Sequence, residues 1–188
     1  MNKFFVILLL LSTLLSCSDN NFIFNGSNLT EAKLDSYFEL TSHKGEEKTI
    51  KDFKGKVVAI FFGFASCPDI CPTTMIELKN IKSELGKNSN QLEVLFISLD
   101  PERDTPELLS EFIPSFDSSF IGLTGTEGNI EKITQQFKVY RKKVVQGGSY
   151  TIDHSSGLYL LDKEGKIRVR HPYGSEIKLI VEDIEKLI

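Results

Sequence analysis

The sequence predicts an α/β fold in which helices flank a central mixed sheet. Two runs, 57–64 and 92–99, are nearly all apolar, as in strands that are covered on both faces. Helical patterns separate these runs, as expected for parallel strands joined by crossover helices. A hairpin around 162–165 then adds antiparallel strands late in the chain.

The expected elements follow one another along the chain. They are a short N-terminal hairpin at 38–50, a turn at 52–56, the strand 57–64, a helix with Pro72 as its first residue and a stop at Gly86, the strand 92–99, a helix opening at 105–107, a strand at 120–123, a helix over 130–137, hairpin strands at 158–161 and 167–169, and a closing helix over 177–187. In the second helix we expect Leu108, Leu109 and Phe112 to face inward.

The first 16 residues match a bacterial lipoprotein signal peptide. Lys3 provides a positive start, and the apolar stretch that follows ends in Leu14-Leu15-Ser16-Cys17, which looks like a lipobox. This stretch is shorter than the roughly 20 apolar residues that span a membrane. We therefore expect cleavage before Cys17 and lipidation of Cys17. The alternative is an ordinary signal peptide, or an uncleaved anchor that happens to contain a cysteine.

This reading divides the chain into a signal peptide (1–16), a lipidated tether rich in Asn and Ser (17–30) and one domain (31–188). The domain would lie on the periplasmic side of a bacterial envelope membrane, and Ser18 leaves open which membrane holds it. The formal net charge is −4 and no basic patch stands out, so nucleic acid is not an expected partner.

The segment Cys67-Pro68-Asp69-Ile70-Cys71-Pro72 lies between the first central strand and a helix. Such a cysteine pair, at the carboxyl end of a strand and entering a helix, predicts a thioredoxin-like fold. The positive end of the helix dipole favours thiolates, so we expect Cys71, with Cys67 as a second candidate, to ionise readily. Two such thiols either form a disulfide or hold a soft metal ion.

Two thiolates leave a metal site incomplete, and the chain has three histidines. His154 lies just before the late hairpin, whose preceding loop passes the cysteine loop in thioredoxin-like folds. Two cysteines and one histidine suit Cu(I) and tolerate Cu(II). On spacing alone, however, an ordinary histidine at position 154 and a structural disulfide between the cysteines both stay open.

Several further residues are weaker candidates. Asp153 can orient the His154 ring by a hydrogen bond, or it can be a plain turn residue. The pair Asp100 and Asp104 can contact a cation or a partner. For that pair, a strand-to-helix loop with a capping aspartate is the favoured alternative. We expect His43 to be exposed in a polar turn. We expect His171 and Met75 to have ordinary structural roles.

From about Tyr37 onward the chain resembles the Sco/SenC family of copper-handling proteins. Three blocks carry the resemblance: Phe62-Gly63-Phe64 leading into the cysteine segment, Ser98 to Pro106, and Asp153-His154-Ser155-Ser156 running into Tyr159 to Asp162. The resemblance implies a thioredoxin-like fold and copper held by Cys67, Cys71 and His154. It also implies an acidic pair matching Asp100 and Asp104, without a role for it.

The resemblance implies an exported copper metallochaperone that delivers copper to, or prepares, the binuclear copper centre of cytochrome c oxidase. The copper-centre subunit would be its partner, together with other periplasmic copper carriers or thiol reductants. A second hypothesis is a thiol-disulfide oxidoreductase that uses Cys67 and Cys71 on exported dithiol proteins. Whether the chain is an enzyme therefore stays open. Peroxide reduction is a weaker third hypothesis, because Cys67 lacks the polar surroundings that peroxidases need.

Overall fold

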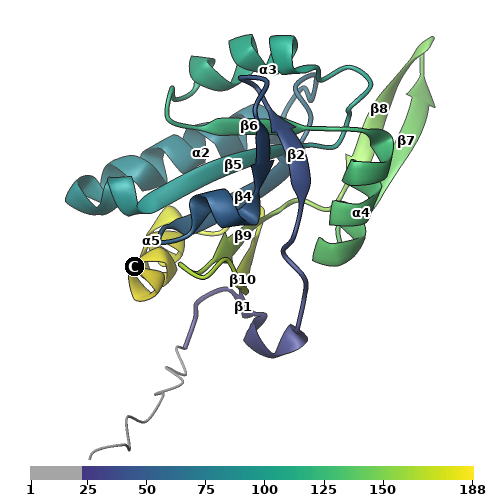
Figure 1. Cartoon of the computed structure of the whole chain (residues 1–188). Coiled ribbons are helices and arrows are strands. Elements are labelled where there is room, and N and C mark those ends of the chain that lie inside the picture. Colours follow the sequence, from purple (N-terminus) through teal and green to yellow (C-terminus); the bar gives the residue numbers. More distant parts are fainter. Residues whose placement is uncertain (1–22) are drawn as a thin grey trace, which may run out of the picture.

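The computed structural model describes residues 23–188 (Figure 1). The predicted signal peptide and the predicted lipidation of Cys17 lie outside the described residues. Within the described part, the predicted architecture is confirmed: a mixed sheet is flanked by helices, and the short N-terminal hairpin forms one edge of that sheet. In that part no helix has the length and the apolar character needed to cross a membrane.

The main sheet has the strand order β1-β10-β9-β4-β5-β6-β2-β3. Its strands are β1 (Ser27–Asn28), β2 (Glu39–Ser42), β3 (Glu47–Thr49), β4 (Val57–Gly63), β5 (Leu92–Ser98), β6 (Ile121–Thr124), β9 (Gly157–Leu161) and β10 (Ile167–Pro172). Strands β4, β5 and β6 run parallel, and the others pair antiparallel. Every residue of β4 is buried, as expected for a central strand that is covered on both faces.

Helices cover both faces of the sheet. They are α2 (Ile70–Glu84), α3 (Pro106–Phe112), α4 (Glu127–Phe137) and α5 (Ile177–Leu187), with 3-10 turns at Thr30–Ala32, Ile50–Phe53, Gly86–Gln91 and Ile113–Ser115. On one face α2 packs beside α5, and Phe96 of β5 meets Phe112 of α3. On the other face Phe62 of β4 meets Phe137 of α4. The alternation of side chains along β4 and β5 thus feeds two apolar layers.

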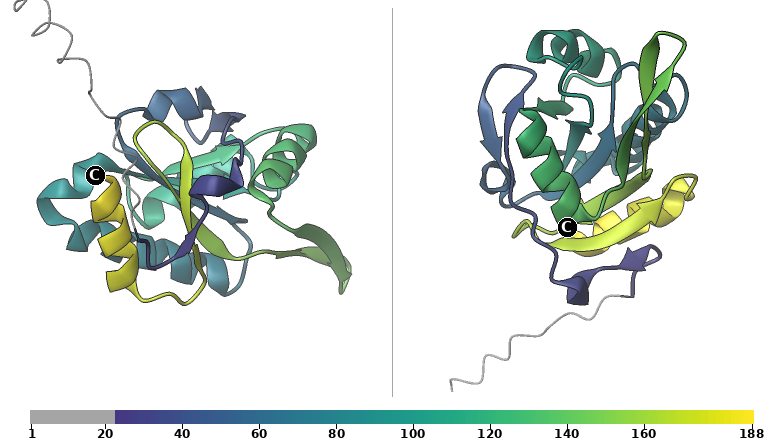
Figure 2. Two further views of the ribbon diagram at one scale, coloured as in Figure 1. Left: turned by 90° about the horizontal axis from the view of Figure 1, so that it is seen from below. Right: turned by 90° about the vertical axis from the view of Figure 1, so that its right-hand side faces the viewer.

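A second, separate hairpin was missed by the sequence reading. Strands β7 (Arg141–Gln146) and β8 (Ser149–His154) pair with each other and project from the body of the domain (Figures 1 and 2). Their two-residue turn, Gly147-Gly148, has φ of 56° and 83°. Positive φ at both central positions is what a tight hairpin turn demands, and glycine meets that demand at little steric cost.

The N-terminal segment lies on the domain earlier than the predicted boundary at residue 31. Strand β1 pairs with β10, and the backbone amides of Asn25 and Gly26 donate to Asp183 of α5 at 2.8 to 3.0 Å. The prediction of a tether up to residue 30 therefore differs from the structure over residues 25–28. The composition of residues 25–28 does not predict this pairing at the edge of the sheet. A strand of two residues is held by partners far away in the sequence, so it leaves no local pattern.

Two details of the helices also differ from the sequence reading. Helix α2 begins at Ile70, so Pro72 is its third residue and Cys71 lies inside the first turn. Proline is tolerated there because the first-turn amides have no partner within the helix. In α3, Leu109 is buried as expected, whereas Leu108 is 41% exposed. A two-turn helix that packs on a sheet buries only one side of its surface.

Candidate metal centre

The two candidate cysteines lie where β4 ends and α2 begins. The amide of Cys67 donates to the carbonyl of Phe64 (N···O 3.1 Å), which closes a turn directly after the strand. Cys71 is fully buried, whereas Cys67 is half-buried. Both are free thiols, and the Cys67 thiol is close enough to Cys71 to raise the pKa of the Cys71 thiol. The structure therefore brings together two sulfur donors, one of which solvent can reach.

Gly63, the last residue of β4, makes room for the Cys71 sulfur. A Cβ atom at position 63 would lie 2.8 Å from Cys71 Sγ and 2.9 Å from ring carbons of Phe61 and Phe96. These separations are shorter than real Cβ contacts. Glycine is thus needed here for close approach, and the sulfur of Cys71 lies directly against the end of the strand.

The expectation that Cys71 ionises readily is wrong. Burial raises the pKa of the Cys71 thiol far above its ordinary value, and the neighbouring Cys67 thiol adds to the rise. A backbone hydrogen bond at Phe64 acts in the opposite direction but does not outweigh the burial. The prediction considered the helix dipole alone, whereas removal of the thiolate from water is the larger effect at this position.

His154 ends β8, and its ring packs edge-on against Phe64, with ring centroids 5.9 Å apart and an interplanar angle of 81°. Its Nδ1 atom lies 3.0 Å from the carbonyl oxygen of Ser155. A carbonyl can only accept, so Nδ1 carries the hydrogen and Nε2 keeps its lone pair. Burial also lowers the pKa of His154, which favours the neutral ring. The imidazole is therefore in the form that binds metals.

The sheet topology explains why His154 approaches the cysteines. Strand β9 is antiparallel to β4, with Leu158 opposite Phe61, so the residues just before β9 reach the carboxyl end of β4. Phe64 lies there against His154. Among residues 23–188, however, no three His, Cys, Asp or Glu side chains converge closely enough to hold a metal ion as they stand. A site with all three donors requires a local movement of His154 or of the cysteine loop.

The acidic pair lies in a strand-to-helix loop, as the favoured alternative expected, but neither aspartate caps the helix. Asp104 is 1% exposed, and its Oδ2 accepts hydrogen bonds from Ser98 Oγ (2.6 Å) and from the amide of Ala65 (3.0 Å). The cap of α3 is Thr105, whose side chain accepts from the amide of Leu108. Asp104 therefore anchors the start of the cysteine loop, and burial raises its pKa.

Asp100, fully buried, connects the same loop to the projecting hairpin. It pairs with Arg103 and accepts a hydrogen bond from the hydroxyl of Tyr150 on β8 (2.8 Å). Arg103 stacks on the Tyr150 ring at 3.9 Å from its centroid and donates to the Tyr150 carbonyl at 3.0 Å. Sequence reasoning missed Arg103 and Tyr150. The Gly147-Gly148 turn signal would have revealed the hairpin that carries Tyr150.

For the four remaining candidate residues, the structure supports some of the expected roles and contradicts others. Asp153 is exposed on β8 opposite Lys142 and makes no hydrogen bond to His154, so it does not orient that ring. The prediction that His43 is exposed is wrong: it is 7% exposed, and its Nδ1 accepts from the amide of Gly122 at 3.1 Å. The structural roles of His171, buried against Asp183, and of Met75, fully buried in the core, are confirmed.

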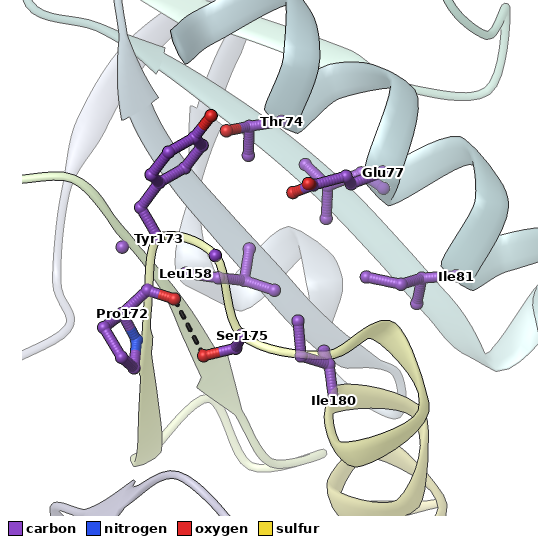
Figure 3. Close-up of a pocket in the computed structure, with 11 residues that line it drawn as sticks. Thr74, Glu77, Ile81, Leu158, Pro172, Tyr173, Ser175 and Ile180 are labelled. Carbon is purple, nitrogen blue, oxygen red and sulfur yellow. Dashed lines mark hydrogen bonds between the residues drawn. The ribbon is translucent and has the colours of Figure 1, made fainter.

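A cavity between α2 and α5 lies on the same face of the sheet as the cysteine helix (Figure 3). Thr74 and Glu77 of α2 line it together with Tyr173, and Ser175 donates to the carbonyl of Pro172 at its edge (2.8 Å). Its volume of about 20 Å³ leaves space for a water molecule and no more. We therefore exclude it as a ligand site.

Three kinds of similarity identify the family. The SCO1/SenC family model matches residues 26–188. An SCO2-like protein of Rickettsia prowazekii is 42% identical over 144 residues, which cover 75% of this chain and 70% of that protein. The structure of ScoI from Bradyrhizobium japonicum with copper bound is similar at a TM-score of 0.76 and 35% identity, covering 82% of this chain and 99% of that one.

Two solved structures of lower identity are also similar. A SCO1/SenC family lipoprotein from Bacillus anthracis is 25% identical, with a TM-score of 0.75, over 88% of this chain and 99% of that one. BsSco, described as a member of the Sco family of cytochrome c oxidase assembly proteins, is 22% identical at a TM-score of 0.68, over 88% and 96%, and supports the fold alone. The predicted thioredoxin-like fold is confirmed. Because the family model spans most of its length, the chain belongs to the SCO1/SenC family.

Proposed function

We propose that this chain is an exported copper metallochaperone. It binds copper through Cys67, Cys71 and His154, and it delivers copper to, or prepares, the binuclear copper centre of cytochrome c oxidase. The observation that supports this most is the donor set: two free thiols in mutual reach, with a neutral imidazole held against the same loop. Two soft sulfurs and one nitrogen suit Cu(I) and tolerate Cu(II).

The relatives support the same cargo, because the Bradyrhizobium protein was solved with copper bound. Applied to this chain, that description makes copper the bound metal. The copper-centre subunit of the oxidase, as the acceptor, is carried over from the resemblance to the Sco/SenC family. Other periplasmic copper carriers or thiol reductants would supply the metal or keep the pair reduced.

The two cysteines would have different roles in copper transfer, because they differ in accessibility. Cys67 is half-buried and can be approached by an acceptor thiol, whereas Cys71 is buried and stays with the core. Asp104 holds the amide of Ala65 and so fixes the loop that bears Cys67. Ligand exchange with an acceptor would then begin at Cys67, the donor that solvent reaches, and end with release from Cys71.

A thiol-disulfide oxidoreductase is the second candidate, and one observation favours it: the two thiols lie within reach of each other. In such a reaction Cys67 attacks a partner disulfide and releases one partner thiol. Cys71 then displaces the other thiol, so that the chain is oxidised and the partner is reduced by two electrons. Burial of Cys71, which raises its pKa, slows the second step unless the loop opens.

The location is part of the proposal. A signal peptide over residues 1–16 and lipidation of Cys17 would tether the domain to the periplasmic side of an envelope membrane. The description of the Bacillus anthracis relative as a lipoprotein supports this anchor. Labelling with a radioactive fatty acid is expected to mark the parent and not the Cys17→Ser variant. A parent that takes up no label would contradict a lipid anchor.

The test of function is a copper titration of the reduced chain beside two variants. The parent is expected to hold one copper tightly per chain, with thiolate-to-Cu(II) absorption. In His154→Ala, copper affinity falls by at least about tenfold because one of three ligands is lost, while the thiols still cycle between dithiol and disulfide. Asp153→Asn is the matched control, since Asp153 is the neighbouring exposed residue and makes no bond to His154.

The outcomes separate the two candidates. Equal copper binding by His154→Ala and the parent would remove His154 from the site. A parent without tight copper, but with rapid cycling of Cys67 and Cys71, would move the assignment to the oxidoreductase.

A further inference from the structure

The β5–α3 loop contacts both halves of the candidate copper site. Its Asp104 accepts a hydrogen bond from the backbone at the start of the cysteine loop (3.0 Å). Its Asp100 and Arg103 hold Tyr150 of β8. His154 is the last residue of that same strand. The loop is closed by its own backbone, because the amides of Arg103 and Asp104 both donate to the carbonyl of Asp100. One closed turn therefore supports the two sulfur donors and the nitrogen donor.

Tyr150 is held at three points. Its hydroxyl donates to Asp100 Oδ1 (2.8 Å), its carbonyl accepts from Arg103 Nη1 (3.0 Å), and the guanidinium lies over its ring, 3.9 Å from the centroid. Asp100 is fully buried, and its other oxygen accepts from Arg103 Nε. Such a buried pair is costly to break, because one partner would be left without a counter-charge. We call Asp100, Arg103 and Tyr150 the Tyr150 clamp.

The Tyr150 clamp and His154 lie on the same face of β8. Side chains alternate along a strand, so every second residue from Tyr150 to His154 points to one face. Between them Ile152 is buried, and the His154 ring packs edge-on against Phe64. The guanidinium of Arg103 lies 6.0 Å from the centroid of that same Phe64 ring. The clamp is therefore next to the contact that holds the imidazole, and not at the tip of the hairpin.

We propose that the Tyr150 clamp positions His154 for copper. It fixes β8 four residues before His154, so the end of the strand can move toward the cysteines while the rest of the strand stays on the domain. Without the clamp, His154 is in place for only a fraction of the time, and the copper affinity falls by that fraction. Arg103 and Tyr150 are then positioning residues, and neither is a ligand. The inference rests on the proposed function, since it needs copper bound by Cys67, Cys71 and His154.

The test compares copper titrations of Tyr150→Phe and Tyr140→Phe in the full, reduced chain. Tyr150→Phe removes the hydroxyl that donates to Asp100 but keeps the ring under Arg103. Its copper affinity is expected to fall by about threefold to tenfold. Tyr140→Phe is the matched control: Tyr140 directly precedes β7, is 56% exposed, and its hydroxyl makes no hydrogen bond to residues 23–188. That variant should bind copper as the parent does.

A second readout needs no metal. In the metal-free chain the ring protons of His154 lie in the field of the Phe64 ring, so their NMR shifts report whether the imidazole is in place. In Tyr150→Phe these shifts are expected to move toward those of an exposed histidine, and in Tyr140→Phe to stay as in the parent. All chains are measured well below their unfolding temperatures, where a lower global stability alone does not move the shifts.

Two further variants separate positioning from folding. Arg103→Lys keeps a cation beside the buried Asp100, but it lacks the fork that also reaches the Tyr150 carbonyl. It is expected to keep most of the stability and still to lose copper affinity. In the His154→Ala background, Tyr150→Phe should have no further effect on copper affinity, because the clamp acts only through His154.

Two results would overturn the proposal. One is a Tyr150→Phe variant with the copper affinity and the His154 shifts of the parent. The other is an equal loss of affinity from Tyr150→Phe in the parent and in His154→Ala, since the substitution would then act on the cysteines or on the whole fold. Failure of the proposed function looks different, because the parent itself would hold no copper tightly. In that case the metal-free shifts still decide whether the clamp positions His154.

Discussion

The cysteine side and the histidine side of the candidate site are built in opposite ways. Cys71 lies in the core, between the end of β4 and the first turn of α2, with its sulfur against Gly63. His154 ends a two-stranded hairpin that projects from the domain and pairs with no strand of the main sheet. The tip of that hairpin exposes Val145, whose side chain is 84% accessible. The cysteine side is fixed by packing in the core, whereas the hairpin buries Ile152 and is otherwise held by polar contacts.

This difference indicates which part moves. A segment with few buried apolar contacts opens at a lower free-energy cost than one in the core. The hairpin is held chiefly by Arg103, which bonds and stacks on Tyr150, and by Arg141, which donates to the carbonyl of Leu99 (2.5 Å) and pairs with Glu127. We therefore expect His154 to approach a nearly stationary cysteine pair, rather than the reverse.

The substitution Arg103→Met tests the difference between the fixed cysteine side and the mobile histidine side most strongly. Asp100 would remain fully buried without its charge partner, so the free energy of unfolding should fall by about 2 kcal/mol. The amides of β7 and β8 should also exchange with solvent at least about tenfold faster, because the contact to Tyr150 is lost. Hydrogen exchange followed by mass spectrometry measures both segments, and urea unfolding measures the total.

Lys142→Met is the control for that variant. Lys142 is exposed on β7, opposite the exposed Asp153 of β8, so the change removes a positive charge from the hairpin but not from the ring of Tyr150. An exposed pair contributes little, so exchange and stability should match the parent. If Arg103→Met leaves hairpin exchange unchanged, or if β4 loosens as much as β8, the division into a fixed side and a mobile side is wrong.

A smaller loss of stability, which comes from His171 in the main sheet, is expected when the pH is lowered. Burial lowers the pKa of His171, and it outweighs the opposing attraction of Asp183; Lys186 lowers the pKa further. The unfolded chain therefore takes up this proton first, at a pH of about 6.5. Stability from His171 is present above that pH and is lost as the pH falls toward its folded pKa. Urea unfolding of the metal-free chain between about pH 7.5 and 5.5 should show the decline.

His171→Gln isolates this contribution. The variant is expected to be less stable at neutral pH but to show a flatter pH dependence over the same range, since glutamine does not titrate. An unchanged slope would mean that His171 is not held neutral in the folded state. Hairpin exchange should be the same in the variant and the parent, because His171 lies on β10 of the main sheet, whereas β7 and β8 form a separate two-stranded sheet.

The buried parts of the fold were the most predictable. The runs that form β4 and β5 are apolar almost without interruption. Such short apolar runs are typical of central strands that are buried on both faces. The hairpin β7–β8 was missed because its residues are mostly polar, and its only strong local signal is Gly147-Gly148. The N-terminal strand β1 had no local signal, because two residues gain their order from β10 alone.

The sequence by itself determined the α/β class, the thioredoxin-like position of the cysteine segment and the choice of candidate donors, because local patterns and residue chemistry carry that information. Only the tertiary structure decided the rest: that Cys71 is too buried to ionise easily, that His43 is enclosed, and that Asp104 holds the start of the cysteine loop. Burial and partners depend on residues far away along the chain, and desolvation by those residues outweighs what a short segment would do alone.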